Sequence, residues 1–368
     1  MSKILIAILL INGFVLLLCS LLSLASRLLR QAGRVNLEVN GQTEQSECGQ
    51  PLLQALAPRQ IFLPAACGGK GTCGRCEVKV LAGGGHHTPL ELLQLAPEKI
   101  AAQSRLACQV RVREDLRVQV AAALLNARSY TVRLKETRQV APTIKTLTFA
   151  LPDDQQIDFL PGQYMQVAFQ QPWEKVLRAY SLASPPQKRN SFSFDVQRVD
   201  GGLVSNYLHG LVPGDPIEVS GPFGDMTLRS EHLDRPLILV AGGVGLAPMR
   251  SMIAHLEHDG FKTPVMLFHG ARSREHLYYE EHYRNLARTC ARFRYFPALS
   301  QPLLEDGWTE ARGMVHTLIE QQLAVATPGK NEPVAFICGP APMMDAVTKV
   351  LVAKGLPSDR IFTDPFDF

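Results

Sequence analysis

The pattern of hydrophobic and polar positions begins with one long apolar run, residues 4–26, which carries no charged side chain. As a helix rising about 1.5 Å per residue, a run of this length spans a hydrocarbon layer of about 30 Å. We therefore predict a membrane anchor over residues 1–33. A signal peptide is the alternative, because residues 23–25 resemble a small-residue cleavage site, although the run exceeds the roughly 7 to 15 apolar residues of a signal-peptide core.

Charges on the two sides of this run predict its orientation. Arg27, Arg30 and Arg34 follow it, whereas Lys3 and the terminal amine precede it. The positive-inside rule then places the rest of the chain in the cytoplasm. We expect a single-pass protein of the inner (cytoplasmic) membrane whose catalytic domains are cytoplasmic.

Residues 34–126 alternate apolar and polar side chains near both of their ends. The first alternation, at 35–39, runs into Asn40-Gly41, a pair typical of a tight hairpin turn. The second covers 110–120, and a short helical pattern at 52–56 precedes a glycine-rich loop with cysteines. We predict a small mixed sheet with one helix.

Residues 127–230 return to the same alternation in shorter stretches. It is clearest at 147–151 and 192–196, and Pro-Gly pairs at 161–162 and 213–214 predict turns. Short strands at such spacing favour an antiparallel barrel.

Residues 231–368 show a different pattern. Their apolar runs at 236–241, 265–268 and 334–338 are continuous, as expected for strands that are buried on both faces of a parallel sheet. Helical segments alternate with these runs, so we predict a doubly wound α/β domain.

Composition agrees with several globular domains and excludes one class of partner. The chain has 368 residues, 20% of them charged, and a net charge of +4. That charge is small for the length, and nucleic-acid binding would need a concentrated basic face, so we expect no nucleic-acid partner. In a reducing compartment the eight cysteines are better suited to metal binding or catalysis than to disulfides.

Four of the cysteines form one spaced set. Cys67, Cys73 and Cys76 give C-x5-C-x2-C, and 31 residues separate the third of them from Cys108. Four thiolates from one loop and a distant strand suit two irons, and the loop glycines let backbone N–H groups point at cluster sulfurs. A zinc site is less well matched because only one pair is C-x2-C. A Rieske centre would require two histidine ligands paired with cysteines, and no such histidine lies near this loop.

Two motifs in the predicted barrel suit a flavin nucleotide. Arg178, Tyr180 and Ser181 lie in RAYS at the end of a strand, and GGLVSNYL at 201–208 opens a helix. An aromatic ring can lie against an isoalloxazine face, an arginine can offset diphosphate charge, and a helix start offers N–H groups to phosphate. A core tyrosine and a capped surface helix are the alternative interpretation.

The last domain contains a glycine-rich turn after a buried strand. GGVGLAPMRS, residues 242–251, lets a diphosphate approach N–H groups at a helix start, although its spacing is not the GxGxxG fingerprint. Cys338, Gly339 and Pro340 end another buried strand, where ligands collect in open parallel sheets.

These motifs resemble known families. The cysteine run and SRLACQV around Cys108 are similar to the β-grasp (α+β) ferredoxin domain in the F subunit of the sodium-translocating NADH:quinone oxidoreductase. RAYS and GGLVS resemble the ferredoxin-NADP reductase superfamily. This resemblance implies FAD rather than FMN, with Tyr180 and Ser181 at the isoalloxazine and Arg178 at the diphosphate. It also implies a set of phosphate-binding residues: Gly202, Val204 and Ser205.

The resemblance extends to nicotinamide. It implies that the glycine-rich turn shapes the nicotinamide site through four residues: Gly242, Gly243, Gly245 and Pro248. Cys338 and Gly339 would lie beside the carbon that gives up hydride, and Phe366 would cover the flavin face, with Phe368 as the alternative. Direct hydride transfer requires proximity and no nucleophilic thiol.

The choice between NADH and NADPH depends on residues 270–279. Arg272, Ser273 and Arg274 could bind a 2'-phosphate, which on electrostatic grounds favours NADPH. The stretch nevertheless resembles that of NADH-using members, so we expect NADH.

The order of the predicted parts gives a path for electrons. A membrane anchor, a ferredoxin domain (34–126), a flavin barrel (127–230) and a nicotinamide domain (231–368) occur in the same order as in that F subunit. We expect NADH to reduce FAD. The electrons then pass to the [2Fe-2S] cluster and on to a membrane acceptor, such as a sodium-pump type complex with ubiquinone.

One departure leaves the acceptor open. The F subunit carries a long insertion where only fifteen residues separate Gly162 from Arg178. The alternatives are the reductase component of a membrane oxygenase or other redox complex, and an electron-carrier protein that does not turn over.

Overall fold

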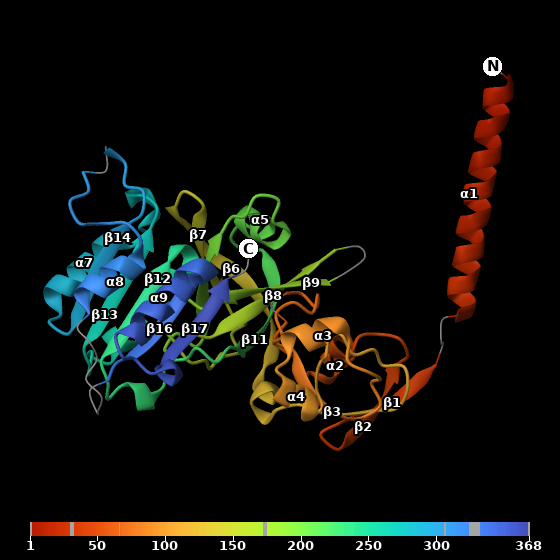
Figure 1. The fold of residues 1–368 in the computed structure, drawn as a ribbon, viewed down its shortest axis with the longest axis horizontal. Helices are drawn as coiled ribbons and strands as arrows, with labels where there is room; N and C mark the ends of the chain where they lie inside the picture. Colours follow the sequence, from red (N-terminus) through yellow and green to blue (C-terminus); the bar gives the residue numbers. More distant parts are fainter. Residues whose placement is uncertain are drawn as a thin grey trace. The chain divides into compact units, whose positions relative to one another are not determined.

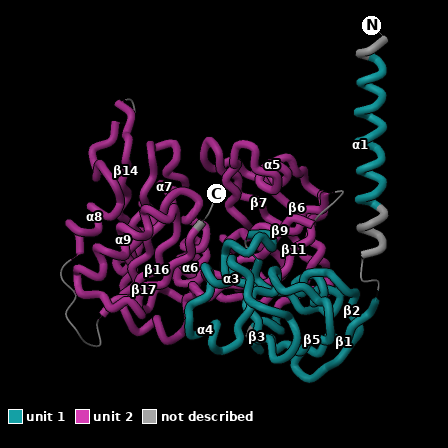
Figure 2. Tube along the Cα trace, turned by 45° about the vertical axis from the view of Figure 1, so that its right-hand side comes forward, with its two compact units in different colours: residues 1–126 teal, residues 127–368 magenta. Residues whose placement is uncertain are grey.

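The computed structural model describes residues 2–29, 33–65, 67–171, 175–304, 307–323 and 332–366. The chain divides into two compact units, residues 1–126 and 127–368, which Figure 2 shows in different colours. Figure 1 gives the order of the helices and strands.

The N-terminal apolar run forms helix α1, Ser2–Leu29. Within it, Leu5–Ser23 has a mean hydropathy of 2.8 and the length and composition needed to cross a membrane. The amide of Asn12 donates to the carbonyl of Ile8 at 2.8 Å, so this polar side chain is paired within the helix.

A five-stranded mixed sheet follows, in the order β2-β1-β5-β3-β4. The predicted hairpin is present, with Asn40 (φ 49°) and Gly41 (φ 86°) in left-handed conformations between β1 and β2. β1 pairs in parallel with β5 and the other pairs are antiparallel. The strands are β1 (Arg34–Val39), β2 (Gln42–Glu47), β3 (Glu77–Ala82), β4 (Ser104–Leu106) and β5 (Leu116–Gln119).

This sheet carries more helices than the single one that the pattern predicted. Helix α2 (Leu52–Leu56) is the predicted one, and α3 (Pro89–Gln94) and α4 (Pro97–Ala101) are additional. Both additional helices begin with proline at their first turn, a position that proline tolerates, and each is too short to show a helical period. Thr88 caps α3 in a reciprocal capping box with Glu91.

The next six strands form an antiparallel sheet in the order β10-β7-β6-β11-β8-β9. It closes into the predicted barrel, since Leu182, directly after β9, bridges to Phe194 of β10. Helix α5 (Leu203–Gly210) packs Val204 and Leu208 into the barrel core. The strands are β6 (Arg128–Ala141), β7 (Ile144–Ala150), β8 (Tyr164–Gln170), β9 (Lys175–Ser181), β10 (Ser191–Gln197) and β11 (Pro216–Phe223).

The C-terminal sheet is parallel throughout, in the order β15-β14-β13-β12-β16-β17. Strand β12, in the middle of the sheet, contributes side chains to two cores. Leu237 and Leu239 pack with α6 and α7, and Ile238 and Val240 pack with α8 and α9. Covering both faces explains the continuous apolar runs. The strands are β12 (Leu237–Gly242), β13 (Val265–Ala271), β14 (Phe293–Leu299), β15 (Ala311–Arg312), β16 (Val334–Pro340) and β17 (Ile361–Phe366). The helices are α6 (Leu246–His258), α7 (Glu280–Thr289), α8 (Val315–Gln322) and α9 (Ala341–Ala353).

Candidate functional site

The four spaced cysteines lie in two pairs. The thiols of Cys67 and Cys73 share a hydrogen bond, which lowers the pKa of Cys67 and raises the pKa of Cys73. The thiols of Cys76 and Cys108 likewise share a hydrogen bond, which lowers the pKa of Cys108 and raises the pKa of Cys76. Within the described residues no three His, Cys, Asp or Glu side chains gather around one metal position. Two pairs of thiols match a cluster with two irons, in which each iron binds two cysteines. A single zinc ion would gather all four ligands around one position.

Backbone N–H groups converge on these sulfurs. Those of Gly71, Thr72 and Cys73 donate to Cys67, and that of Gly71 also donates to Cys108. Gly71 has φ 81°, and a Cβ there would lie 2.6 Å from Nε2 of Gln109, which itself donates to Sγ of Cys108 at 3.6 Å. N–H donors around thiolates stabilise their negative charge, so this loop fits a [2Fe-2S] cluster.

A buried ion pair supports the strand that leads to Cys108. Glu91, fully buried, accepts from Nε and Nη2 of Arg105 at 2.8 and 2.9 Å and from the N–H of Leu106 at 2.9 Å. Arg105 also donates to carbonyls at positions 84, 85 and 86. One guanidinium therefore joins α3, β4 and the glycine loop that follows β3.

Strand β9 places the three predicted flavin residues along one edge of the barrel. The Tyr180 ring lies 5.7 Å from the ring of Phe194, and burial raises the pKa of Tyr180. Oγ of Ser181 is buried and has no hydrogen-bond partner among the described atoms, as expected for a hydroxyl that a bound flavin would satisfy. Arg178 donates from Nη1 to the carbonyl of Leu177 at 2.8 Å.

The predicted phosphate-binding residues surround the start of α5. Gly202 is the N-cap, and a Cβ on it would lie 2.5 Å from Oγ of Ser205. That Oγ accepts from the N–H of Val199 at 3.2 Å. The Val204 side chain is buried in the barrel core, so only its backbone can face a ligand.

A cavity of about 480 Å³ opens where the parallel strands end. Gly242 and Gly243 line it from the end of β12, and Gln197 lines it from the end of barrel strand β10. The cavity lies at the carboxyl ends of the strands, the usual ligand position in doubly wound sheets. Its further lining residues include Arg272, Met314, Pro340 and Met343.

The glycine-rich turn has two kinds of glycine. Gly243 has φ 55° and nothing within 4 Å of a Cβ there, so its backbone faces open space. A Cβ on Gly245 would instead lie 2.1 Å from the carbonyl oxygen of Cys338, which holds the turn against β16. Pro248 is buried in α6.

Cys338 lies inside the sheet. It is fully buried, and its Sγ donates to the carbonyl of Asp364 at 3.1 Å. Gly339 follows with φ 154°. The backbone of Phe366 belongs to β17, but its side chain and all of Phe368 lie outside the described residues.

The two arginines that could favour NADPH are separated. Arg272 lines the cavity, whereas Nε of Arg274 pairs with Glu280 at 3.2 Å and faces a different groove. Ser273 is buried and hydrogen-bonds His276 at 2.7 Å. Of these two arginines, only Arg272 therefore lines the nucleotide cavity.

Sequence reasoning missed the polar residues that hold these parts together. They include Asp195 and Arg250, an ion pair between the barrel and α6, and the pair formed by Glu91 and Arg105. A signal was available for Asp195, which is the one charge inside SFSFDVQ, an otherwise uncharged strand.

Three families match successive parts of the chain. A 2Fe-2S iron-sulfur cluster binding domain matches residues 37–113, an oxidoreductase FAD-binding domain matches 131–228, and an oxidoreductase NAD-binding domain matches 239–349. The predicted cofactors and their order along the chain are thus confirmed.

Relatives match nearly the whole chain. The F subunit of the Na(+)-translocating NADH-quinone reductase of Methylococcus capsulatus is 31% identical over 91% of this chain and 92% of its own length. The F subunit of the same enzyme in Neisseria meningitidis is 30% identical over 99% of both chains.

Solved structures share the fold. An Amycolatopsis cytochrome P450 reductase, GcoB, has a TM-score of 0.71 at 27% identity and covers 90% of this chain and 98% of its own. A ferredoxin reductase of carbazole 1,9a-dioxygenase has a TM-score of 0.68 at 26% identity and covers 91% and 99%.

These matches agree with the paired cysteines, the unpaired Ser181 hydroxyl and the cavity at the strand ends. The chain therefore belongs to the family of the Na(+)-translocating NADH-quinone reductase F subunits, and it is an NADH-dependent oxidoreductase that uses FAD and a [2Fe-2S] cluster.

Proposed function

We propose that this chain oxidises NADH and passes the electrons through FAD, and then through a cluster held by Cys67, Cys73, Cys76 and Cys108, to an acceptor in the membrane. The observation that carries the proposal is the cavity shared by two domains. Gly243 lines it from the nicotinamide domain and Gln197 from the flavin barrel. A dinucleotide in this cavity contacts both, so its nicotinamide can reach a flavin on the barrel edge.

FAD, when bound, accepts a hydride as two electrons and gives electrons up one at a time. The residues of this chain bind and orient the two nucleotides. In this proposal Tyr180 lies against the flavin ring, Ser181 hydrogen-bonds it, and Arg178 offsets diphosphate charge. Gly202, Val204 and Ser205 offer N–H and hydroxyl groups at the start of α5.

The nicotinamide side works through backbone shape. Gly242 and Gly243 let the diphosphate approach the start of α6, whose N–H groups favour an anion. Gly245 keeps this turn against Cys338 and Gly339 of β16, and Pro248 is buried in α6. The thiol of Cys338 is hydrogen-bonded to a backbone carbonyl. In this proposal Cys338 is a small residue at the strand end near the nicotinamide and has no role as a nucleophile.

The relatives are subunits, which implies a multisubunit membrane complex. We propose that helix α1 anchors this chain as a single-pass protein of the inner membrane, with residues 34–368 in the cytoplasm. The three arginines after the apolar run support this orientation.

The test of turnover uses the full-length protein in detergent. We expect it to be brown, to contain flavin, and to reduce ferricyanide with NADH much faster than with NADPH. A flavin-containing brown protein that fails to oxidise NADH would instead be an electron carrier that does not turn over.

A second candidate acceptor is a membrane oxygenase. The Neisseria relative aligns over 404 positions, more than the length of this chain, so it carries residues that this chain lacks. Here β8 and β9 pair from Tyr164 with Ser181 to Gln170 with Lys175, which leaves a short connection. Among the solved neighbours are a cytochrome P450 reductase and the ferredoxin reductase of carbazole 1,9a-dioxygenase.

Co-purification from native membranes distinguishes the two acceptors. The proposed function predicts recovery of the other subunits of a quinone reductase and NADH-dependent quinone reduction. Recovery of an oxygenase in their place would contradict it.

A further inference from the structure

A polar network joins the flavin barrel to the nicotinamide domain outside the nucleotide cavity. Nη1 of Arg250, on α6, lies 2.5 Å from Oδ1 of Asp195, on barrel strand β10. The hydroxyl of Thr146, on β7, donates to the same Oδ1 at 2.7 Å and lies 3.1 Å from the hydroxyl of Tyr279. The Arg250 guanidinium stacks 4.1 Å above the Tyr279 ring centroid.

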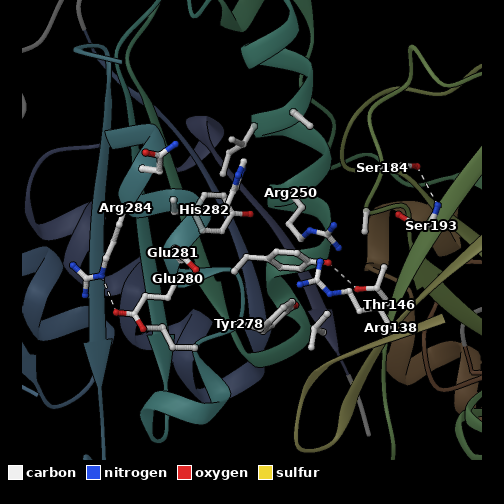
Figure 3. A pocket seen from close by; sticks show the side chains of 18 of the residues that line it. Arg138, Thr146, Ser184, Ser193, Arg250, Tyr278, Glu280, Glu281, His282 and Arg284 are labelled. Carbon is white, nitrogen blue, oxygen red and sulfur yellow. Dashed lines mark hydrogen bonds and ion pairs between the residues drawn. The ribbon is translucent and has the colours of Figure 1, made fainter. Parts of the chain in front are cut away.

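The network crosses a groove between the two domains. This groove has a volume of about 1600 Å³ and is lined by Thr146, Arg250 and Tyr279 among others. Figure 3 shows Arg250 extending from its helix toward Thr146 of the barrel. Because the groove separates the domains around them, these side chains make a direct connection at this point, and Ser251 adds a hydrogen bond to the carbonyl of Ser184 at 2.7 Å.

The ion pair is buried, which makes it a costly way to add stability. The Asp195 side chain has no exposed surface and that of Arg250 is 18% exposed. Desolvation of two charges commonly offsets their attraction, so apolar residues at the same positions would often stabilise the fold to at least the same extent. What a buried, hydrogen-bonded pair adds is a defined geometry, because its distances and angles are restricted.

Both ends of the pair are attached to the proposed reaction site. Asp195 follows Phe194, whose ring packs against Tyr180, and β10 ends at Gln197 in the nucleotide cavity. Arg250 lies on α6, which begins directly after the glycine turn. A shift of the pair therefore moves the flavin edge relative to the nicotinamide turn.

We propose that Asp195 and Arg250, with Thr146 and Tyr279, are positioning residues for hydride transfer. They set the separation between the nicotinamide carbon that loses the hydride and the flavin that accepts it. NADH is oxidised and the flavin reduced by the same electron pair, and the proton of the hydride travels with it. This inference rests on the proposed NADH oxidation.

The test is single-turnover reduction of the flavin by saturating NADH, measured per bound flavin in full-length protein. Asp195→Asn and Arg250→Met should slow this step by roughly 10- to 100-fold, because a misplacement of about 1 Å has such an effect on a reaction that depends on alignment. The isotope effect on turnover with NADH deuterated at the transferred position should rise, while KM changes much less. Arg250→Lys should recover part of the rate, since it keeps the charge but not the planar stacking.

The matched control is Asp158→Asn. Asp158 pairs with Arg189 at 2.6 Å on the exposed barrel surface, with side chains 76% and 51% exposed, so the same chemical change should leave flavin reduction unchanged. Should Asp195→Asn lose its flavin, Thr146→Val and Tyr279→Phe each remove one hydroxyl and should slow the same step in the same direction.

The outcomes separate this inference from the function on which it rests. Wild-type protein that does not reduce its flavin with NADH contradicts the proposed function. Active wild-type protein together with flavin-containing network variants of unchanged rate and isotope effect overturns the positioning role alone.

Discussion

The backbone of Gly245 contacts the carbonyl of Cys338 so closely that a Cβ would lie 2.1 Å from the oxygen and 2.4 Å from the carbon. These residues belong to the turn before α6 and to the neighbouring strand β16. The contact seats the turn on the sheet while Gly243, two residues earlier, faces open space.

The two glycines should therefore respond differently to alanine. Gly245→Ala forces backbone apart and should lower the free energy of unfolding by roughly 1–3 kcal/mol, as overpacking does. Gly243→Ala adds a methyl group where we place the diphosphate, and the left-handed φ of 55° disfavours alanine by roughly 1 kcal/mol, so it should raise KM for NADH and destabilise less than Gly245→Ala. Thermal unfolding and NADH kinetics of both variants measure the difference. Equal effects on KM and stability in the two variants would contradict this assignment.

Cys73→Ser should remove most of the [2Fe-2S] signal in electron paramagnetic resonance of the reduced protein. One thiol of the Cys67 and Cys73 pair is lost, and thiolates are the preferred ligands of iron–sulfur clusters. Reduction of flavin by NADH should persist, since it does not use the cluster. Cys290→Ser, outside the set, is the control, and an intact cluster signal in Cys73→Ser would show that the ligand set is wrong.

Glu91→Gln should destabilise the cluster domain by about 3–5 kcal/mol, because it leaves the buried Arg105 guanidinium without its charge partner. Glu38→Gln breaks the exposed pair with Arg117, whose side chain is 55% exposed, and should cost less than about 1 kcal/mol. Loss of visible cluster absorbance during thermal unfolding reports both. Similar midpoints for the two variants would show that the buried pair adds nothing.

The same pair predicts a dependence on pH. Burial acts to raise the pKa of Glu91, but hydrogen bonds from Arg105 and from the N–H groups of Thr88 and Leu106 outweigh it and lower that pKa. A lowered folded-state pKa adds stability above the ordinary value of 4.5, and this stability is lost as the pH falls through the folded-state pKa. Acid unfolding followed by cluster absorbance should thus lose part of its pH dependence in Glu91→Gln.

Removal of residues 366–368 should change NADH turnover or affinity. From the family resemblance we expect the Phe366 ring to lie on the flavin face, where nicotinamide would displace it. Steady-state kinetics with NADH measure this effect, with Phe362→Leu as a control for general damage to the C-terminal strand. Kinetics equal to the wild type would contradict the assignment.

Much of the architecture follows from periodicity. The hairpin at Asn40-Gly41, the alternating barrel strands and the buried parallel strands all appear where the pattern predicts them, because each lies in one regular element. The pattern did not reveal α3 and α4, which are shorter than two helical turns. Local patterns also give no information on long-range pairs, such as Asp195 with Arg250, 55 residues apart.

The site shows the same division. The spacing of the cysteines indicated a cluster, but not that Cys67 lies with Cys73 and Cys76 with Cys108, because pairing depends on the folded loop. Arg272 and Arg274 looked alike in the sequence, yet Glu280, on a following helix, pairs with Arg274 while Arg272 lines the nucleotide cavity.

The pairing of the cysteines affects how long the protein should persist in the cell. In the proposed ligand set Cys67 and Cys108 become joined through iron and sulfide, which closes a long loop as a disulfide would. On the chain-entropy account a cross-link over such a loop is worth about 4 kcal/mol. Cells short of iron should therefore degrade this domain faster, and abundance of the protein should follow iron supply without any change in its synthesis.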